Sequence, residues 1–120
     1  MPTYHYHYLC NVEISEGGLA KFLRFHDEPY RSGDLMLDAF QGEVEADSPE
    51  AAADMVFRIH NEDDRPTGKT CPSMSPGDVA TINKQAFACQ PIGWQEVPVP
   101  TNRFGGTWLD IVTLLKGVSA

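Results

Sequence analysis

Hydrophobic and polar residues alternate strictly over residues 3–14. The even positions are apolar or aromatic, beginning with Tyr4, Tyr6 and Tyr8, whereas His5 and His7 occupy odd positions. This period of two predicts a β-strand whose even face is more buried than the face that carries the histidines. Gly17-Gly18 then predicts a hairpin turn. Residues 19–26 fit either a strand or one short helical face, and the preceding glycines favour a strand that pairs with the first.

The clearest local signal is Ser48-Pro49-Glu50, which predicts the start of a helix. Ser48 can accept hydrogen bonds from free backbone amides, proline is tolerated at the first helical position, and Glu50 suits the positive end of the helix dipole. The helix is expected to run to about His60. The apolar positions that form its buried stripe are Ala52, Met55, Val56 and Ile59. Residues 35–46, just before it, are typical of a strand that bends or bulges near Gly42.

Prolines and glycines divide the rest of the chain. Residues 65–78 are expected to form a loop that ends in a type II turn at Pro76-Gly77. A short strand over 79–82, a turn at Asn83-Lys84 and a last strand over 86–97, broken at residues 91–93, should follow. Pro98 and Pro100 indicate a linker, and residues 107–115 fit a C-terminal helix.

The predicted fold class is therefore α+β in one domain over residues 1–120. We expect a mostly antiparallel sheet of about four or five strands, one central helix packed on a face of it, and the C-terminal helix. No apolar run approaches the roughly 18 residues of a membrane span, and the first residues do not resemble a signal peptide, which predicts a cytoplasmic protein without a membrane partner. The three widely spaced cysteines predict free, buried thiols.

The net charge of −8 is unevenly distributed. Residues 27–64 contain twelve acidic and two basic side chains. This sign disfavours direct nucleic-acid binding, which depends on Lys and Arg. It suits a basic protein partner, or it simply keeps the protein soluble. Imitation of DNA by the carboxylates is a special case of that role, and a homo-oligomer stays open. The candidate protein-binding residues are Glu45, Asp47, Glu62, Asp63 and Asp64. If the contact were instead apolar, it would be sought around Trp94, Phe104 and Trp108.

Familiar catalytic patterns are incomplete, so we predict a non-enzymatic protein with no catalytic residues and no cofactor. Gly68-Lys69-Thr70 lacks the earlier glycine of a phosphate-binding loop, and Ser73 and Ser75 lack the Gly-x-Ser-x-Gly frame. Cys71 with His60 as its base would need an oxyanion hole that the sequence does not reveal.

A metal-dependent binder or enzyme is the alternative function. His5 and His7 lie on one face of the predicted strand, and two such histidines can bind Zn²⁺ with further ligands from His26, His60 or an acid. No complete metal-binding motif is present, so the leading prediction includes no metal site.

Residues 35–97 resemble the YodL-like family of small proteins from bacteria, phages and mobile elements. The resemblance follows the helix-end Asn61, a loop glycine, a serine segment before Asp78-Val79 and Gly93-Trp94 in the last strand. It departs from the family pattern at Ile59-His60 and at Pro76-Gly77. The resemblance implies an actinobacterial phage or integrated-element origin but no reaction, and it leaves residues 98–120 as a linker and C-terminal helix. The residues that we assign to a structural motif are Ser48, Asn61, Gly68, Ser73, Ser75, Asp78 and Gly93.

Overall fold

The computed structural model describes residues 1–14, 20–22, 30–62, 64–66 and 74–105. In chain order, its elements are β1 (Thr3–Ile14), β2 (Ala20–Phe22), β3 (Met36–Glu45), α1 (Pro49–Ile59), β4 (Val79–Ile82), β5 (Gln85–Cys89), β6 (Trp94–Val97) and β7 (Arg103–Gly105). The α+β class is thereby confirmed, with one helix and a mostly antiparallel sheet in this part of the chain. The helix predicted over residues 107–115 and the turn at Gly17-Gly18 lie outside the described residues.

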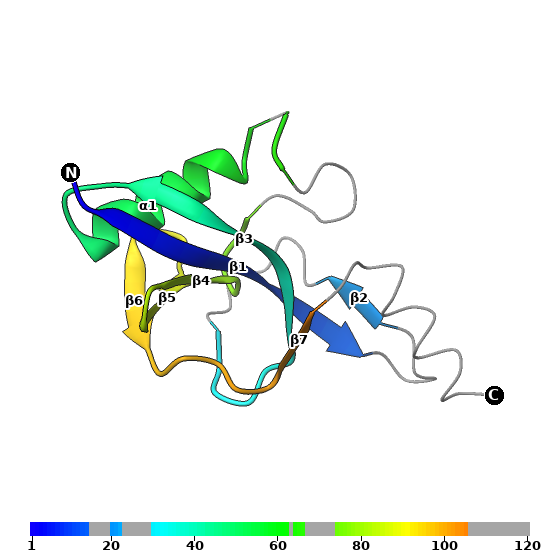
Figure 1. The fold of residues 1–120 in the computed structure, drawn as a ribbon. Helices are drawn as coiled ribbons and strands as arrows, with labels where there is room; N and C mark the ends of the chain where they lie inside the picture. Colours follow the sequence, from blue (N-terminus) through cyan, green and yellow to red (C-terminus); the bar gives the residue numbers. More distant parts are fainter. Residues whose placement is uncertain (15–19, 23–29, 63, 67–73, 106–120) are drawn as a thin grey trace.

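The sheet is built around the long strand β1 (Figure 1). Its strand order is β6-β5-β4-β1-β3-β7, and β2 pairs separately with the far end of β1. All pairs are antiparallel except β3 with β7, which is parallel. The described residues form seven strands, more than predicted, because the 86–97 segment folds into the hairpin β5–β6 and because β7 forms within the predicted linker.

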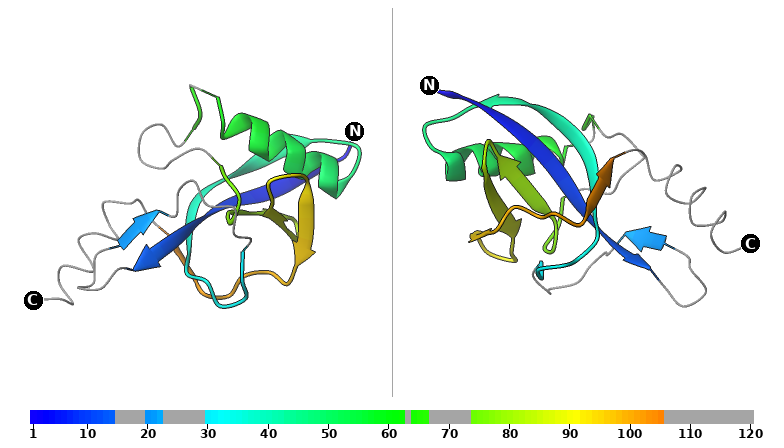
Figure 2. Two further views of the ribbon diagram at one scale, coloured as in Figure 1. Left: turned by 180° about the vertical axis from the view of Figure 1, so that it is seen from behind. Right: turned by 60° about the horizontal axis from the view of Figure 1, so that its bottom comes forward.

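Helix α1 covers one face of the sheet (Figure 2). Tyr6, Tyr8 and Val12 of β1 are buried in the same core cluster as the inner residues of α1, while His5 is exposed on the other face. The predicted alternation is confirmed for these residues. The face of the histidines is not open along its whole length, however, because Leu9 is buried in a second, smaller core cluster with Met36, Val79, Ala86 and Ala88.

The start of α1 follows from its sequence. Ser48 is the N-cap, and its side chain accepts a hydrogen bond from the Ala51 amide at 3.1 Å. Pro49 occupies the first turn, where its missing amide costs no hydrogen bond. Ala52, Ala53 and Val56 are buried against the sheet, which gives the helix the apolar stripe that the sequence predicts.

Strand β3 contains an irregularity, but not where the sequence predicts it. The register against β1 shifts between Tyr8 and Leu9, which face Phe40 and Asp38, so that Ala39 is the extra residue. Gly42 is instead paired regularly with Tyr6. A Cβ at Gly42 would lie 3.1 Å from ring atoms of both Tyr6 and Phe40, so the close approach of these rings explains the glycine.

The segment that leads into β4 forms the predicted turn. The Asp78 amide donates to the Ser75 carbonyl at 3.0 Å, and Gly77 has φ +98°, the conformation expected for the third position of a type II turn. Asn83 (φ +53°) likewise forms the tight turn between β4 and β5.

Cys10 and Cys89 differ in their covalent state. Cys89 is a free, buried thiol, as predicted, and burial raises its pKa to about 12. Cys10 is disulfide-bonded, so the prediction of a free thiol is wrong there. Cys71 lies outside the described residues.

The described residues include no helix with the length and apolar composition that crossing a membrane requires.

Candidate functional site

The solvent-facing side of α1 carries three charges and one exposed aromatic ring. Glu50, Asp54, Phe57 and Arg58 follow one another at helical spacing, opposite the buried alanines, and all four are exposed. Phe57 has 39% of its surface exposed, which is high for so large an apolar side chain. Glu50 and Arg58 lie at the helix ends that suit their charges, whereas Asp54 in the middle has no such explanation.

Asp54 instead positions a tryptophan from the sheet. The Trp94 indole N–H donates to Asp54 Oδ1 at 2.7 Å, and the Trp94 ring packs edge-on against Phe57 with centroids 6.3 Å apart. Trp94 is the first residue of β6, an end strand in the sheet order of the described residues. We call the residues gathered here the α1–β6 surface: Glu50, Asp54, Phe57, Arg58, Trp94 and Glu96.

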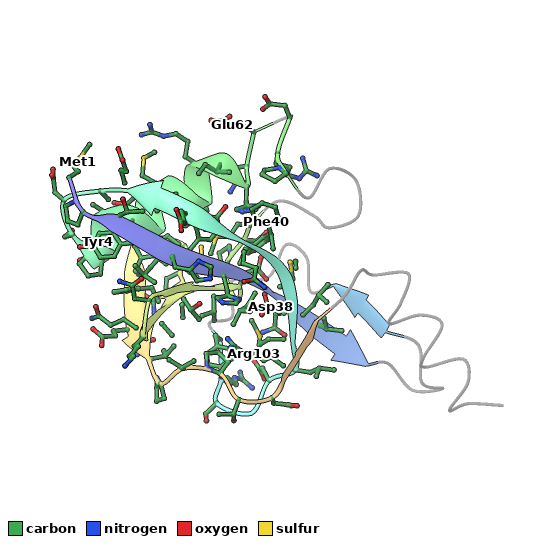
Figure 3. The ribbon with its side chains drawn as sticks, in the orientation of Figure 1. Met1, Tyr4, Asp38, Phe40, Glu62 and Arg103 are labelled. Carbon is green, nitrogen blue, oxygen red and sulfur yellow. The ribbon has the colours of Figure 1, made fainter. Side chains whose placement is uncertain are left out.

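The five acidic residues predicted to bind a partner do not form one cluster. Glu45 follows Val44, which is buried beneath α1, so Glu45 is exposed on the opposite face of the sheet. Asp47 precedes the helix, while Glu62 and Asp64 follow it, and all three are exposed. Figure 3 shows Glu62 beyond the end of α1. The helix has 11 residues, so these positions are separated by about 16 Å along its axis. Asp63 lies outside the described residues.

The acids after the helix are at the electrostatically unfavourable end. The C-terminus of a helix carries partial negative charge, so Glu62 and Asp64 gain no stability from the dipole. Asp47 and Glu50 at the other end do. Glu62 and Asp64 are therefore better explained by solubility or binding than by the stability of the fold.

The opposite face of the sheet carries the predicted histidines. The His5 and His7 rings are in edge contact, with centroids 5.2 Å apart, and His7 Nδ1 lies 2.9 Å from Asp38 Oδ2. Asp38 is on β3 (Figure 3). The contact orients the His7 ring and leaves Nε2 pointing away from Asp38. Among the described residues, no group of three His, Cys, Asp or Glu side chains is arranged to bind a metal ion.

His60, the fourth histidine of the chain, is the C-cap of α1, and its side chain is buried in the core. His60 Nε2 is hydrogen-bonded to the Tyr6 hydroxyl at 3.1 Å, and its ring stacks against Tyr8 with centroids 4.4 Å apart. His60 Nδ1 is buried without a hydrogen-bond partner in this part of the structure. Burial lowers the pKa of His60 to about 4, and the charge of Arg65 acts in the same direction. His60 is thus a neutral core residue, inaccessible to a substrate.

Asp78 is the buried carboxyl of this core. Its oxygens accept hydrogen bonds from the backbone amides of Asn11 and Ser75, each at 2.9 Å, and from the Tyr8 hydroxyl at 3.4 Å. Burial raises the pKa of Asp78 to about 7, although these three hydrogen bonds act in the lowering direction. The carboxyl connects β1 to the turn before β4, which is a structural task.

The other residues assigned to a structural motif also make local contacts. Asn61 Nδ2 donates to the carbonyls of Phe57 and Met74, at 2.8 and 3.2 Å, and so joins the end of α1 to the segment before β4. Gly93 adopts φ +77° in the turn before β6. Gly68 and Ser73 lie outside the described residues.

A small cavity among the described residues lies beside the second core cluster, against which its lining residues Tyr30 and Val97 pack. It has a volume of about 310 Å³, and the residues that line it are Tyr30, Ser32, Gly33, Gln95, Val97, Pro98, Val99, Pro100 and Thr101. None of these lining residues carries a charge.

Sequence reasoning missed Asp54 and Phe57, and it named Trp94 only for the apolar alternative. The missing signal is the contact between Asp54 and Trp94, which are 40 positions apart in the chain.

Comparison of the chain with protein-family models, with curated proteins and with solved structures gave no significant match. The resemblance to the YodL-like family stays a prediction.

Proposed function

We propose that the protein acts by binding a basic protein partner through the α1–β6 surface, without catalysis and without a cofactor. The observation that carries the proposal is the Trp94–Asp54 hydrogen bond of 2.7 Å, which holds an aromatic pair at the surface beside exposed carboxylates that outnumber the cation Arg58. Aromatic anchors surrounded by charged residues are typical of protein interfaces.

The charges at this surface indicate the kind of partner. Glu50, Asp54 and Glu96 are exposed here, and Arg58 is the single cation of the α1–β6 surface as defined above. Glu62 and Asp64, beyond the helix end, extend the negative potential. Such a field speeds the approach of a positively charged protein and repels an acidic one.

The origin and compartment remain part of the proposal. The resemblance implies a phage or mobile element, whose product would meet a host or element protein in the cytoplasm. The disulfide at Cys10 is more typical of oxidising compartments. Cys10 is buried in the folded chain, so thiol labelling in denaturant, on protein isolated without reductant, tests this point. A labelled Cys10 fits the cytoplasm, and an unlabelled Cys10 argues against it.

Affinity capture from a host lysate tests the proposed function. The variant Asp54→Lys/Glu62→Lys should lose the captured partner, because it reverses two charges at or beside the α1–β6 surface. The matched control Glu43→Lys/Glu45→Lys reverses two charges on the opposite face of the sheet and should retain it. If the control loses the partner and the first variant keeps it, the binding surface is wrongly assigned.

The His7–Asp38 contact favours a second candidate, a metal-dependent role for the histidine face. With no three-ligand group among the described residues, a metal would need a further ligand from elsewhere. Metal analysis of the purified protein tests this candidate. A stoichiometric metal that is lost in His5→Ala/His7→Ala would support it, and a metal-free protein would reject it.

A further inference from the structure

Within the described part of the chain, strand β6 presents unpaired backbone groups beside the α1–β6 surface. It is the end strand of the sheet, paired only with β5 among the described residues. Both backbone groups of Cys89, its neighbour in β5, are directed toward β4, since its amide donates to the Asp78 carbonyl at 2.8 Å and its carbonyl accepts from the Gly77 amide at 3.1 Å.

The outward-facing residues of β6 follow from this. Cys89 is paired with Trp94, so that pair is not hydrogen-bonded, and the backbone N–H and C=O of Trp94 point away from β5. Antiparallel pairs alternate, so Gln95 and Val97 bond to β5 while Glu96 again points outward. Trp94 and Glu96 therefore offer two amides and two carbonyls at the edge, and their side chains share the face of α1.

We propose that the partner binds as an extended basic segment that adds a strand to the β6 edge. This inference rests on the proposed function and specifies how the partner is recognised. Backbone pairing would occur with Trp94 and Glu96, which places alternate side chains of the segment beside Phe57 and Asp54. A lysine or arginine there meets Asp54 and Glu96, and an apolar side chain meets the Trp94–Phe57 pair.

The charge of the protein argues against a second copy as the occupant. The chain carries a net charge of −8, and Glu96 at the edge of one copy would face Glu96 or Asp54 of another. Charged residues on an edge strand discourage pairing between identical sheets. The same carboxylate attracts a basic strand, so Glu96 selects the partner as well as protecting the edge.

Amide exchange on the wild-type protein tests the inference, with a short peptide of alternating lysine and valine as the probe. Bound peptide should slow exchange at Trp94 and Glu96, because their amides become hydrogen-bonded, and leave Gln95 and Val97 unchanged, because theirs are already bonded. The same peptide N-methylated at its lysine amides keeps the charge but lacks the N–H groups that would face Trp94 and Glu96, so it should bind more weakly.

Two variants separate backbone pairing from charge. Glu96→Ala removes the carboxylate and keeps the amide, whereas Glu96→Pro removes both at a position where the edge strand tolerates proline. Loss of a backbone hydrogen bond should make Glu96→Pro bind the lysine–valine peptide about tenfold more weakly than Glu96→Ala.

The outcomes distinguish this inference from the proposed function. If the peptide binds without slowing exchange at Trp94 and Glu96, and Glu96→Pro equals Glu96→Ala, edge pairing is overturned. If the Asp54→Lys variant then failed to bind the lysine–valine peptide, the result would still support a binding site at the α1–β6 surface. If the peptide does not bind, edge pairing is overturned and the lysate capture alone decides the proposed function.

Discussion

The two sides of α1 place similar chemistry in opposite surroundings. On the inner side, Asp78 accepts three hydrogen bonds in the core, and only 4% of its surface is exposed. On the outer side, Asp54 accepts one hydrogen bond from Trp94 and stays in contact with solvent. A buried carboxyl holds the chain together through its partners, whereas an exposed one keeps most of its charge available to another molecule. Stability should therefore depend on the inner side and binding on the outer side.

The sharpest contrast is expected between Asp78→Ala and Asp54→Ala. Removal of the Asp78 carboxyl takes away the acceptor of the buried Asn11 amide and of the half-buried Ser75 amide, which should lower the free energy of unfolding by about 2–5 kcal/mol. Asp54→Ala removes one exposed hydrogen bond and should cost about 1 kcal/mol or less. Denaturant unfolding of both variants measures the difference, and equal losses would contradict the comparison.

Two buried groups, Asp78 and His60, should change the free energy of unfolding in opposite directions as the pH is varied. Asp78 has a pKa raised to about 7, so its stabilising effect is present below its unfolded pKa of 3.8 and is lost as the pH rises toward 7. His60 has a pKa lowered to about 4. Its contribution to the free energy of unfolding is therefore complete above pH 6.5 and is lost as the pH falls toward 4. Between about pH 4 and 6.5 the two slopes cancel.

Single substitutions should uncover each slope. In Asp78→Asn only His60 remains, and stability relative to wild type should rise with pH between about 4 and 6.5. In His60→Gln only Asp78 remains, and relative stability should fall over the same range. Unfolding midpoints measured across this range check both signs, and parallel profiles for the two variants would contradict the assignment.

At the start of α1, Ser48→Ala should reduce the free energy of unfolding by about 0.5–2 kcal/mol. The substitution removes the acceptor of the Ala51 amide, and Ser48→Asp serves as the control because aspartate caps a helix equally well. A midpoint unchanged from wild type in Ser48→Ala would mean that the cap adds nothing.

The smallest effects are expected from charge reversal at the two helix ends. Asp47→Lys/Glu50→Lys places positive charge at the positive end of the dipole and should destabilise the protein by about 0.3–1 kcal/mol per residue. Glu62→Lys/Asp64→Lys makes the same change at the negative end and should leave stability unchanged or slightly higher. A destabilised second variant would assign Glu62 and Asp64 a structural task.

Local patterns predicted the elements near α1 well. Ser48-Pro49 located the helix start, and the alternation of Tyr6, His7 and Tyr8 oriented β1, because each depends on neighbours in the chain. The sequence predicted the bulge at Gly42, whereas the structure has it at Ala39. A glycine in a strand indicates either a bulge or a side chain packed closely against the backbone, and at Gly42 the Tyr6 ring packs there.

The candidate site could be predicted only in part. The run of acids indicated a charged surface. Val44 and Glu45 are consecutive residues of a predicted strand, however, and the alternation of a strand already implied that Glu45 points to the face opposite Val44. The contacts of Asp54 with Trp94 and of Asp78 with Asn11 join positions 40 and 67 residues apart. Such contacts follow from strand order, which the sequence pattern does not determine.

The Trp94 indole N–H resonance should report directly whether the outer side of α1 binds a basic partner. Titration with a short lysine peptide should shift this resonance, because the Asp54 carboxylate that accepts its hydrogen bond also attracts the lysines. The shift should shrink as salt is raised, since screening weakens attraction between exposed charges, and a glutamate peptide of equal length should produce none. A Trp94 resonance that stays unchanged while those of His7 and Asp38 shift would contradict the account.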